Sequence, residues 1–427
     1  MRGKAGRVKG IPQGLKPECF YALFGTTKVV PCYRTVRVWI CQTLSAANVV
    51  AAGVACMALA GCRPHDFPQF PASYREYAYV TNGASGTVTV LDVVHLRLDR
   101  EIAVGQNPVA VSASPTRNEV YVVNSGAADS HGSVSVIDAE KNAVSATIPV
   151  HRQPVSIDRD RDGKLAYVAN SGSNTVSVID LEARKEIAAI GVGERPQSAR
   201  ISADEKTLVV ANHGGNSVSV VDAGSRRVRA IFTGCPGASN VVILPDSSKA
   251  FVACTDGHQV MVIMLERDAQ PDKPAQPDKM EALLDVGRAP AHLTLKPDGG
   301  ETFVLSSVAN SVSEVYNTTD EVGSTYLIGN GPADGAVTSD NSLLYVANAR
   351  SQYVTLYSID DGKRAGSVHV GDGPSAMAFS KAGHLLFVVD TGTDDVAAIR
   401  TSTRSLFALL PAGRGPNAIA VKAFSVK

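Results

Sequence analysis

The sequence is notable first for what it lacks. It has one tryptophan, and its seven cysteines include no Cys-x-x-Cys pair. After residue 62 it shows no helical periodicity, which leaves short β-strands as the main structural signal. It has no convincing Ser-His-Asp order, paired-carboxylate spacing or glycine-rich phosphate loop, so no motif indicates an enzyme class.

What is present is a repeat. The tetrapeptide Tyr79-Val80-Thr81-Asn82 returns with variations seven more times, at steps of 42, 46, 42, 42, 52, 42 and 42 residues. A period near 42 residues built from short alternating strands predicts the blades of a β-propeller. The later copies begin at Tyr121, Tyr167, Val209, Phe251, Phe303, Tyr345 and Phe387.

One unit, from Gly193 up to Cys235, shows the expected blade. A Gly-x-x-Pro turn precedes four short strands, expected at 197–201, 207–212, 218–222 and 228–233. In that turn we expect the glycine to supply a positive φ and the proline to fix φ at the entry to the innermost strand. The asparagine that closes the second strand is expected to form a turn, with its side chain bonded to backbone two residues on.

The two ends of the repeat region complement each other. The first copy lacks its innermost strand, and residues 416–421 read as an innermost strand with nothing after it. Pairing the last strand into the first blade would close the ring and remove both free edges. The prediction is therefore an all-β fold with eight four-stranded blades, and seven blades is the alternative.

The repeated Tyr-Val-x-Asn motif, the Val-Ser-Val-Ile-Asp strands and the Gly-x-x-Pro turns resemble the YVTN β-propeller repeat family over about residues 76–425. That family includes archaeal and bacterial cell-surface proteins, and it is similar in architecture to haem d1 propellers and propeller-type lactonases. The sole tryptophan, Trp39, lies outside this region, which disfavours WD40 blades and quinoprotein dehydrogenase blades. The resemblance implies a fold and does not supply catalytic residues.

The N-terminal segment carries a separate signal. Residues 36–60 are apolar, Arg34 and Arg37 flank their start, and the segment ends at Leu59-Ala60-Gly61-Cys62. This pattern resembles a bacterial lipoprotein signal cleaved before a lipidated Cys62; a signal-anchor helix with a chance cysteine is the alternative. We therefore expect a signal sequence at 1–61, a tether at 62–75 and the propeller at 76–427, in an exported protein anchored to the cell envelope by lipid.

Removal of the signal changes the charge. The first 61 residues hold eight Lys or Arg and one acidic residue, so the remainder has 33 basic and 40 acidic residues, a formal net charge of about −7. Nucleic-acid binding favours a basic stripe, so we expect no nucleic-acid partner.

Deviations from the repeat are where a site is expected. The second and fourth residues after the turn proline form a small or polar set that should surround the central axis, and blades 3 to 7 make it polar. This one-sided lining at the channel mouth is the candidate ligand site. A water-filled channel with a stabilising Asp158–Arg200 pair is the alternative. The residues of the site are Asp158, Arg200, Asn240, His292 and Asp334.

Other polar residues give weaker signals. Cys235 and Cys254 both replace repeat residues in blade 5, at positions that should be neighbours. An exported location is oxidising, so a disulfide between them is one hypothesis, and two free, part-buried thiols are the alternative. The histidines match no metal-binding spacing, and no cofactor is expected. The tandem Ala-Gln-Pro-Asp-Lys copies make 264–280 a flexible loop insertion, either neutral or a docking epitope.

Three functions remain open. The sequence favours a binding or interaction platform for an unknown protein or small molecule. The second is a lactonase-like or haem d1-related enzyme, with Asp334 or Asp158 as base or metal ligand and His292 as acid–base partner. The third is a structural surface-layer component.

Overall fold

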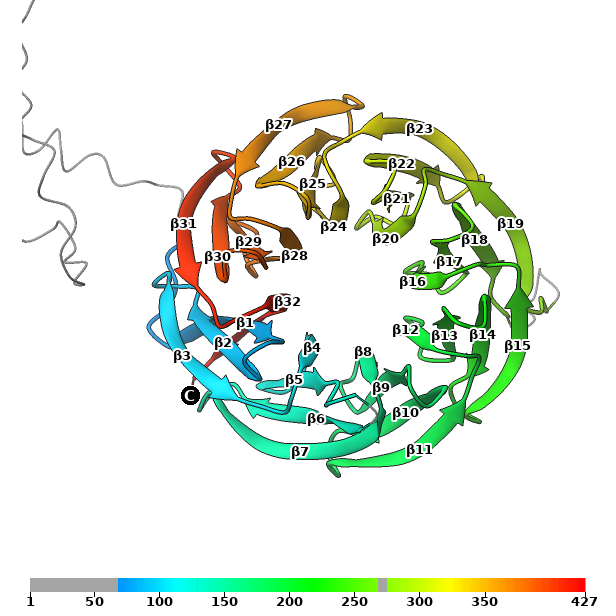
Figure 1. The fold of residues 1–427 in the computed structure, drawn as a ribbon, viewed down its shortest axis with the longest axis horizontal. Helices are drawn as coiled ribbons and strands as arrows, with labels where there is room; N and C mark the ends of the chain where they lie inside the picture. Colours follow the sequence, from blue (N-terminus) through cyan, green and yellow to red (C-terminus); the bar gives the residue numbers. More distant parts are fainter. Residues whose placement is uncertain (1–67, 129, 268–274, 427) are drawn as a thin grey trace, which may run out of the picture. The chain divides into compact units, whose positions relative to one another are not determined.

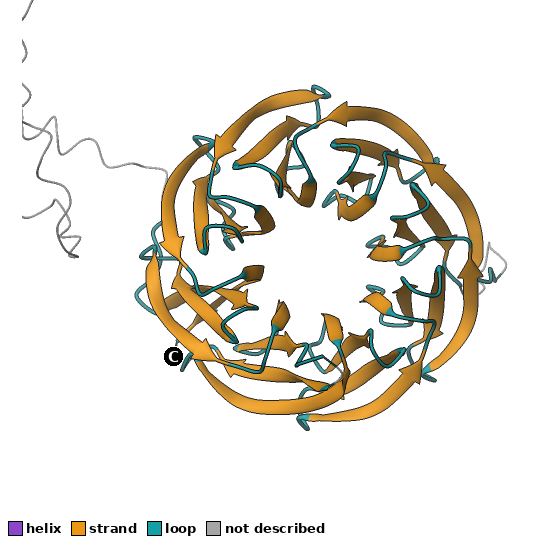
Figure 2. Ribbon diagram, in the orientation of Figure 1, coloured by secondary structure: helices purple, strands orange, loops and turns teal. Residues whose placement is uncertain are grey.

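A computed structural model describes residues 68–128, 130–267 and 275–426. The expected signal sequence and the lipidation residue Cys62 lie outside these ranges. In the described part every regular element is a strand (Figure 2). Accordingly, none of these residues belongs to a helix of the length and apolarity that a membrane crossing needs.

Residues Asp66–Lys427 form one compact unit, in which eight antiparallel sheets of four strands surround a central axis (Figure 1). The prediction of eight blades is confirmed, and the alternative of seven is wrong.

Each blade is given from its innermost to its outermost strand. Blade 1 consists of β32 (Pro416–Ser425), β1 (Tyr74–Asn82), β2 (Thr87–Asp92) and β3 (Arg97–Ala103), and blade 2 of β4 (Pro108–Ala113), β5 (Glu119–Asn124), β6 (His131–Asp138) and β7 (Ala143–Arg152). Blade 3 consists of β8 (Pro154–Arg159), β9 (Leu165–Asn170), β10 (Thr175–Asp180) and β11 (Lys185–Gly191), and blade 4 of β12 (Pro196–Ile201), β13 (Thr207–Asn212), β14 (Ser217–Asp222) and β15 (Arg227–Thr233).

Blade 5 consists of β16 (Ala238–Ile243), β17 (Lys249–Cys254), β18 (Gln259–Met264) and β19 (Lys279–Asp285), and blade 6 of β20 (Pro290–Leu295), β21 (Glu301–Ser306), β22 (Ser311–Tyr316) and β23 (Glu321–Leu327). Blade 7 consists of β24 (Pro332–Val337), β25 (Leu343–Asn348), β26 (Tyr353–Ser358) and β27 (Lys363–His369), and blade 8 of β28 (Pro374–Phe379), β29 (Leu385–Asp390), β30 (Asp395–Arg400) and β31 (Ser405–Pro411).

The chain ends close the ring, as predicted. β32 lies antiparallel beside β1, with Ala78 opposite Val421 and Val80 opposite Ile419 (Figure 1). β1 begins at Tyr74, two residues before the expected start of the propeller. Just before it, Phe70 stacks on Tyr74 with ring centroids 4.4 Å apart, so this end of the expected tether packs against the ring.

The core lies between neighbouring blades. The second strand of each blade is almost wholly buried because both of its faces are covered; all six residues of β13, for example, are buried. One apolar cluster joins Val209 and Val220 of blade 4 to Val252 and Ile263 of blade 5. A single blade therefore cannot bury its own faces, and stability is shared around the ring. The outermost strands alternate between partly buried and exposed residues, as in β23.

The glycine of the Gly-x-x-Pro turn has a role other than the expected one. Positive φ occurs at the third residue of the turn, such as Arg195 at 51° or Gly415 at 64°, so the prediction for the glycine is wrong. A Cβ on Gly193 would lie 2.6 Å from the side chain of Asn212, the asparagine that closes the second strand. Glycine is required because this asparagine packs directly on the turn.

The asparagine itself bonds across its blade. The Asn212 amide nitrogen donates to the hydroxyls of Ser217, at 3.3 Å, and Ser219, at 2.9 Å, on the third strand. Asn82 makes the same pair of bonds to Thr87 and Thr89. The expectation of a bond to backbone two residues on is therefore wrong for these blades. The Tyr-Val-x-Asn and Val-Ser-Val motifs recur together because the side chains of one satisfy those of the other.

In blade 5 the glycine and the asparagine are both replaced by cysteine. The structure joins Cys235 and Cys254 in a disulfide, with their Cα atoms 4.8 Å apart. Both residues are fully buried. Met261 occupies the place where other blades carry the hydroxyl of Ser219 or Thr89, so an asparagine at 254 would lack its usual partner. The covalent bond takes the place of a polar contact that this blade cannot form.

The described ends of the insertion in blade 5 are held to the ring. Arg267 and Gln276 form a two-way backbone pair. The Arg229 guanidinium contacts Asp278 through Nε at 2.5 Å and Nη2 at 2.9 Å. Glu266 also pairs with Arg229, at 3.2 Å. Residues 268–274 of the loop insertion expected at 264–280 lie outside the described residues.

The disulfide gives a first prediction. The Cys235→Ala/Cys254→Ala variant should lose about 3 kcal/mol of unfolding free energy, because a crosslink over some twenty residues restricts the unfolded chain. Guanidinium unfolding followed by fluorescence measures the loss. Reduction of the wild type should reproduce it and should leave the variant unchanged. A free thiol found at Cys235 by peptide mapping of unreduced protein would contradict the bond.

Candidate functional site

The blades place two sets of turns on opposite ends of the ring. The Gly-x-x-Pro turns and the loops between second and third strands share one end, here called the turn face, because the strands alternate in direction. The first-to-second and third-to-fourth strand turns share the other, here called the hairpin face. The five predicted site residues lie on innermost strands, at the second or fourth position after the turn proline or its equivalent.

His292 and Asp334 are brought together across the junction of blades 6 and 7. His292 Nε2 lies 3.1 Å from Asp334 Oδ1. The carboxylate also accepts the backbone N–H of Met377 in blade 8, at 2.7 Å, and that of its neighbour Gly335, at 2.8 Å. Burial raises the pKa of Asp334, and the histidine and the two N–H groups oppose that rise. Both oxygens of this carboxylate are therefore engaged by the protein.

The other predicted residues repeat this arrangement. Asp158 accepts the backbone N–H of Ile201 in the next blade at 3.0 Å, and Arg200 Nη1 lies 3.7 Å from its other oxygen. Asn240 accepts the N–H of Leu293 in the next blade at 3.2 Å. In all three cases an axial side chain satisfies an N–H on the free edge of the following innermost strand. The site is thus a set of pairwise contacts between neighbouring blades, and His292 with Asp334 is distant in blade order from Asp158 with Arg200.

Two further residues share this role and were missed by the sequence analysis. Arg159 donates to the carbonyl of Ala113 in the preceding blade at 2.7 Å, and Lys422 donates to that of Ser114 in the following blade at 2.8 Å. Burial lowers the pKa of Lys422. Arg159 stands at the fifth position, where most blades have an apolar residue, and that departure was the available signal.

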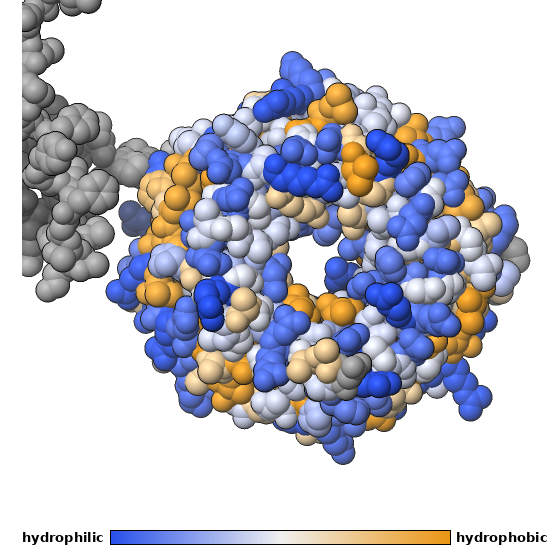
Figure 3. All heavy atoms as spheres, in the orientation of Figure 1, coloured by the Kyte–Doolittle hydropathy of each residue, from blue (hydrophilic) through white to orange (hydrophobic). Residues whose placement is uncertain are grey.

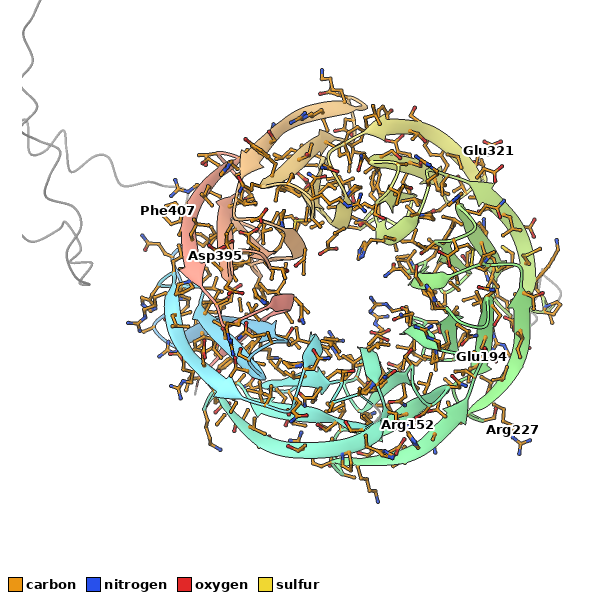
Figure 4. The ribbon with its side chains drawn as sticks, viewed as in Figure 1. Arg152, Glu194, Arg227, Glu321, Asp395 and Phe407 are labelled. Atoms are coloured by element: carbon orange, nitrogen blue, oxygen red, sulfur yellow. A yellow bond between two sulfur atoms is a disulfide. The ribbon has the colours of Figure 1, made fainter. Side chains whose placement is uncertain are left out.

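The channel through the ring is open and its rim is uneven. Figure 3 shows hydrophilic residues at the rim beside β12 and β16, and hydrophobic ones near β4 and β8. Figure 4 shows polar side chains extending inward beside β12 and β16. The rim is therefore polar beside blades 4 and 5 and apolar beside blades 2 and 3 at this end of the channel.

A cavity of 380 Å³ opens on the turn face beside the channel mouth. Its wall includes the third turn residues of blades 2, 3 and 4, which are Asn107, Gln153 and Arg195, with φ between 50° and 51°. The same turn position holds glycine in blades 5, 7, 8 and 1, namely Gly237, Gly331, Gly373 and Gly415.

At this turn position, blades 2, 3 and 4 therefore have non-glycine residues with left-handed backbone conformation, which costs some conformational energy. No hydrogen bond joins the side-chain polar atoms of Asn107, Gln153 or Arg195 to another described residue. Ala127 and Ala128, which lie between β5 and β6, line the same cavity, as does Gln197.

The histidines do not converge. The rings of His131 and His151 lie 6.1 Å apart, and His151 Nε2 is 3.3 Å from Glu186 Oε1. His258 Nδ1 accepts the backbone N–H of Ala289 at 3.3 Å. Within the described ranges, no three His, Cys, Asp or Glu side chains are grouped to hold a metal ion.

Comparison with known proteins agrees with this architecture. The family model described as YNCE-like beta-propeller matches residues 164–425, more than half of the chain. The chain belongs to the YNCE-like β-propeller family. No curated protein sequence matches this propeller significantly.

Solved structures resemble this YNCE-like propeller at low sequence identity, which bears on the fold alone. Dihydro-haem d1 dehydrogenase NirN has a TM-score of 0.64 at 13% identity, covering 84% of this chain and 77% of its own. Citrobacter koseri AztD has a TM-score of 0.61 at 14% identity, covering 83% and 99%. Kuenenia stuttgartiensis hydrazine synthase has a TM-score of 0.53 at 21% identity, covering 69% and 96%.

One buried acid in the YNCE-like propeller departs from the repeat. Asp390 occupies the asparagine position of blade 8, is fully buried, and accepts the backbone N–H of Gly371 at 2.9 Å. Burial raises its pKa to about 7, the Gly371 bond opposes this, and nearby Asp395 adds to it. Its second oxygen has no hydrogen-bond partner.

Asp390→Asn should therefore stabilise the protein, and more at pH 8 than at pH 5. The folded state holds this proton from about pH 3.8 to 7 while the unfolded state releases it, so stability falls as the pH rises through that window. Asparagine cannot ionise, so it removes the free-energy cost of burying this titrating carboxyl group, and it can donate to Asp395 as Asn82 donates to Thr87. We expect a gain of about 2 kcal/mol at pH 8, from urea unfolding at both pH values. A gain independent of pH would show that Asp390 is ionised throughout.

Proposed function

We propose that this chain is a lipid-anchored, cell-envelope propeller of the YVTN-repeat type that acts as a binding platform for a small molecule or protein. Nucleic acid is not a proposed partner, given the acidic balance of residues 62–427. The platform rests on the fold, and the anchor rests on the Leu59–Cys62 pattern.

One observation favours binding over catalysis. The axial groups suited to acid–base chemistry are engaged in holding blades together, since Asp334 and Asp158 each accept a backbone N–H from the next blade. A general base needs a lone pair directed at substrate. By contrast, the polar side chains at the turn-face cavity have no partner within the described chain. The side chains that are free to bind a ligand thus line the turn-face cavity, whereas the carboxylates that could act as a base are already bonded to backbone inside the channel.

The cavity has the features of a small recognition site. Its volume of 380 Å³ falls in the range of small-molecule pockets. Arg195 supplies one cation, Asn107, Gln153 and Gln197 supply carboxamides, and Val155 supplies an apolar surface. These groups stand on turns at the ends of rigid strands, which is a favourable arrangement for a preformed site.

A thermal-shift panel of metals, lactones, haem and glycans, with lactone hydrolysis followed in parallel, tests the platform. We expect a rise in melting temperature without turnover for at least one class. Arg195→Gly should abolish the rise, because it removes the cation while φ at 51° suits glycine. Arg227→Ala is the matched control, because Arg227 lies on an outermost strand and points away from the ring (Figure 4).

Asp334→Asn separates the two functions. It keeps an acceptor for the Met377 N–H and removes the base, so a binding platform should keep its ligand response. Lactone hydrolysis that is lost in Asp334→Asn would establish the enzyme instead. No response to any class in the panel would count against small-molecule binding.

The anchor has its own test. Bacteria expressing the full chain and supplied with an alkyne-tagged palmitate should label it, and Cys62→Ser should abolish the label and release the protein from the membrane fraction. Cys56→Ser, in the same apolar segment, should keep the label. Absence of label on the wild-type chain, or label unaffected by Cys62→Ser, would rule the anchor out.

A further inference from the structure

On the hairpin face, the tyrosine of the second strand points its hydroxyl toward the next blade, and two junctions show how that hydroxyl is satisfied. Between blades 1 and 2, Tyr79 donates to Asn142 Oδ1 at 2.6 Å. Between blades 2 and 3, Tyr121 donates to Glu119 Oε2 at 2.9 Å. The same Glu119 holds Arg184 of blade 3, with Nη2 to Oε1 at 2.5 Å. An oxygen acceptor completes each junction.

The junction of blades 7 and 8 lacks this acceptor. Leu343 of blade 7 occupies the position that Glu119 has in blade 2. Arg404, in the third-to-fourth strand turn of blade 8, occupies the position that Asn142 has in blade 2 and Arg184 in blade 3. The Tyr345 side chain is fully buried and its hydroxyl has no hydrogen-bond partner. Arg404 forms no ion pair with a described residue and, like any arginine, can only donate. Two donors thus face the position that a carboxylate occupies between blades 2 and 3.

A cavity of 650 Å³ lies at this junction. Its apolar wall includes Tyr345 and Phe379, whose rings are nearly perpendicular with centroids 5.9 Å apart, together with Leu343 and Val337. Lys381 and Arg404 line it, and neither forms an ion pair with another described side chain.

Asp340 is the one acid in the lining, and its Oδ1 is occupied by the hydroxyls of Thr338 and Ser342. The wall therefore combines an excess of positive charge with an aromatic surface.

The junction between blades 3 and 4 resembles this one in sequence but differs in the position of its acid. Between blades 3 and 4 the equivalent residues are Leu165, Tyr167 and Arg226. There, however, Asp160 replaces Thr338, and this buried carboxylate lies close enough to help raise the pKa of Tyr167. A buried carboxylate is thus built into the protein at that junction. Blade 7 has Thr338 in its place, and there the exposed Asp340 is the acid that helps to raise the pKa of Tyr345.

We propose that the cavity between blades 7 and 8 binds a small organic carboxylate with an apolar body. The carboxylate supplies the acceptor that Glu119 supplies between blades 2 and 3, accepting from Arg404 and the Tyr345 hydroxyl with Lys381 alongside. The apolar body lies against Phe379 and Val337. Arg404 is exposed, so its side chain can turn with the ligand. This site lies on the hairpin face, opposite the turn-face cavity, and does not depend on the proposed platform function.

Calorimetric titration of the full chain with benzoate and hexanoate tests the proposal, with benzamide and hexanol as neutral analogues of similar shape. We expect saturable binding of one or both carboxylates, weakened by added salt because charges contribute, and at least about tenfold weaker binding of the matching neutral compound. Failure of both carboxylates to bind, or equal affinity for a carboxylate and its neutral analogue, would overturn the proposal.

Arg404→Asn is the decisive variant. Arg404 has φ of 53°, a conformation that asparagine accepts well, and the new side chain can take the Tyr345 hydroxyl as Asn142 takes that of Tyr79. The variant should fold with unchanged or higher melting temperature and bind carboxylates at least about tenfold more weakly. Arg226→Asn, at the same turn position in blade 4 with φ of 59°, is the control and should leave binding unchanged. Unaltered binding in Arg404→Asn, or an equal loss in both variants, would reject the site.

Discussion

The whole structure depends on burial of both faces of every blade. Each sheet is a thin layer with apolar side chains on two sides, so it is stable only between two neighbours. A row of such layers would still expose the outer faces of its first and last members. Pairing of β32 with β1 removes that problem, because the chain's two ends build one blade and leave no terminal layer. The closed ring then fixes the central axis, and every axial contact follows from it.

Closure brings eight innermost strands side by side, each with one edge that no strand of its own blade covers. The N–H and carbonyl groups on these edges face the channel and would be costly to leave unsatisfied. Asp158, Asn240 and Asp334 accept from the next blade, while Arg159 and Lys422 donate to carbonyls. The polar lining is therefore explained largely by the needs of the backbone, and both proposed binding sites lie at the turns at either end.

The contact between turn and second strand shows how a repeat can vary without disturbing the ring. In blade 4 it is Gly193 against Asn212, in blade 5 a disulfide, and in blade 8 Gly371 against a buried acid. Each solution meets the same geometric demand, which is that two chain segments approach closely beside the turn face. The junctions on the hairpin face vary in the same manner, and a junction that lacks one member of its set leaves space for a ligand.

The sequence by itself determined the fold. The 42-residue period, the strand lengths and the missing first strand depend on local pattern and chain order, so they predict eight blades closed by the last strand, with seven blades as the alternative. Local pattern also located the axial residues and the paired cysteines of blade 5. Only the tertiary structure decided what these residues do, because their partners lie in neighbouring blades some 40 residues away. The role of the turn glycine, the occupied oxygens of Asp334 and the unpaired hydroxyl of Tyr345 all depend on such contacts, and no pattern within one repeat contains the distances that create them.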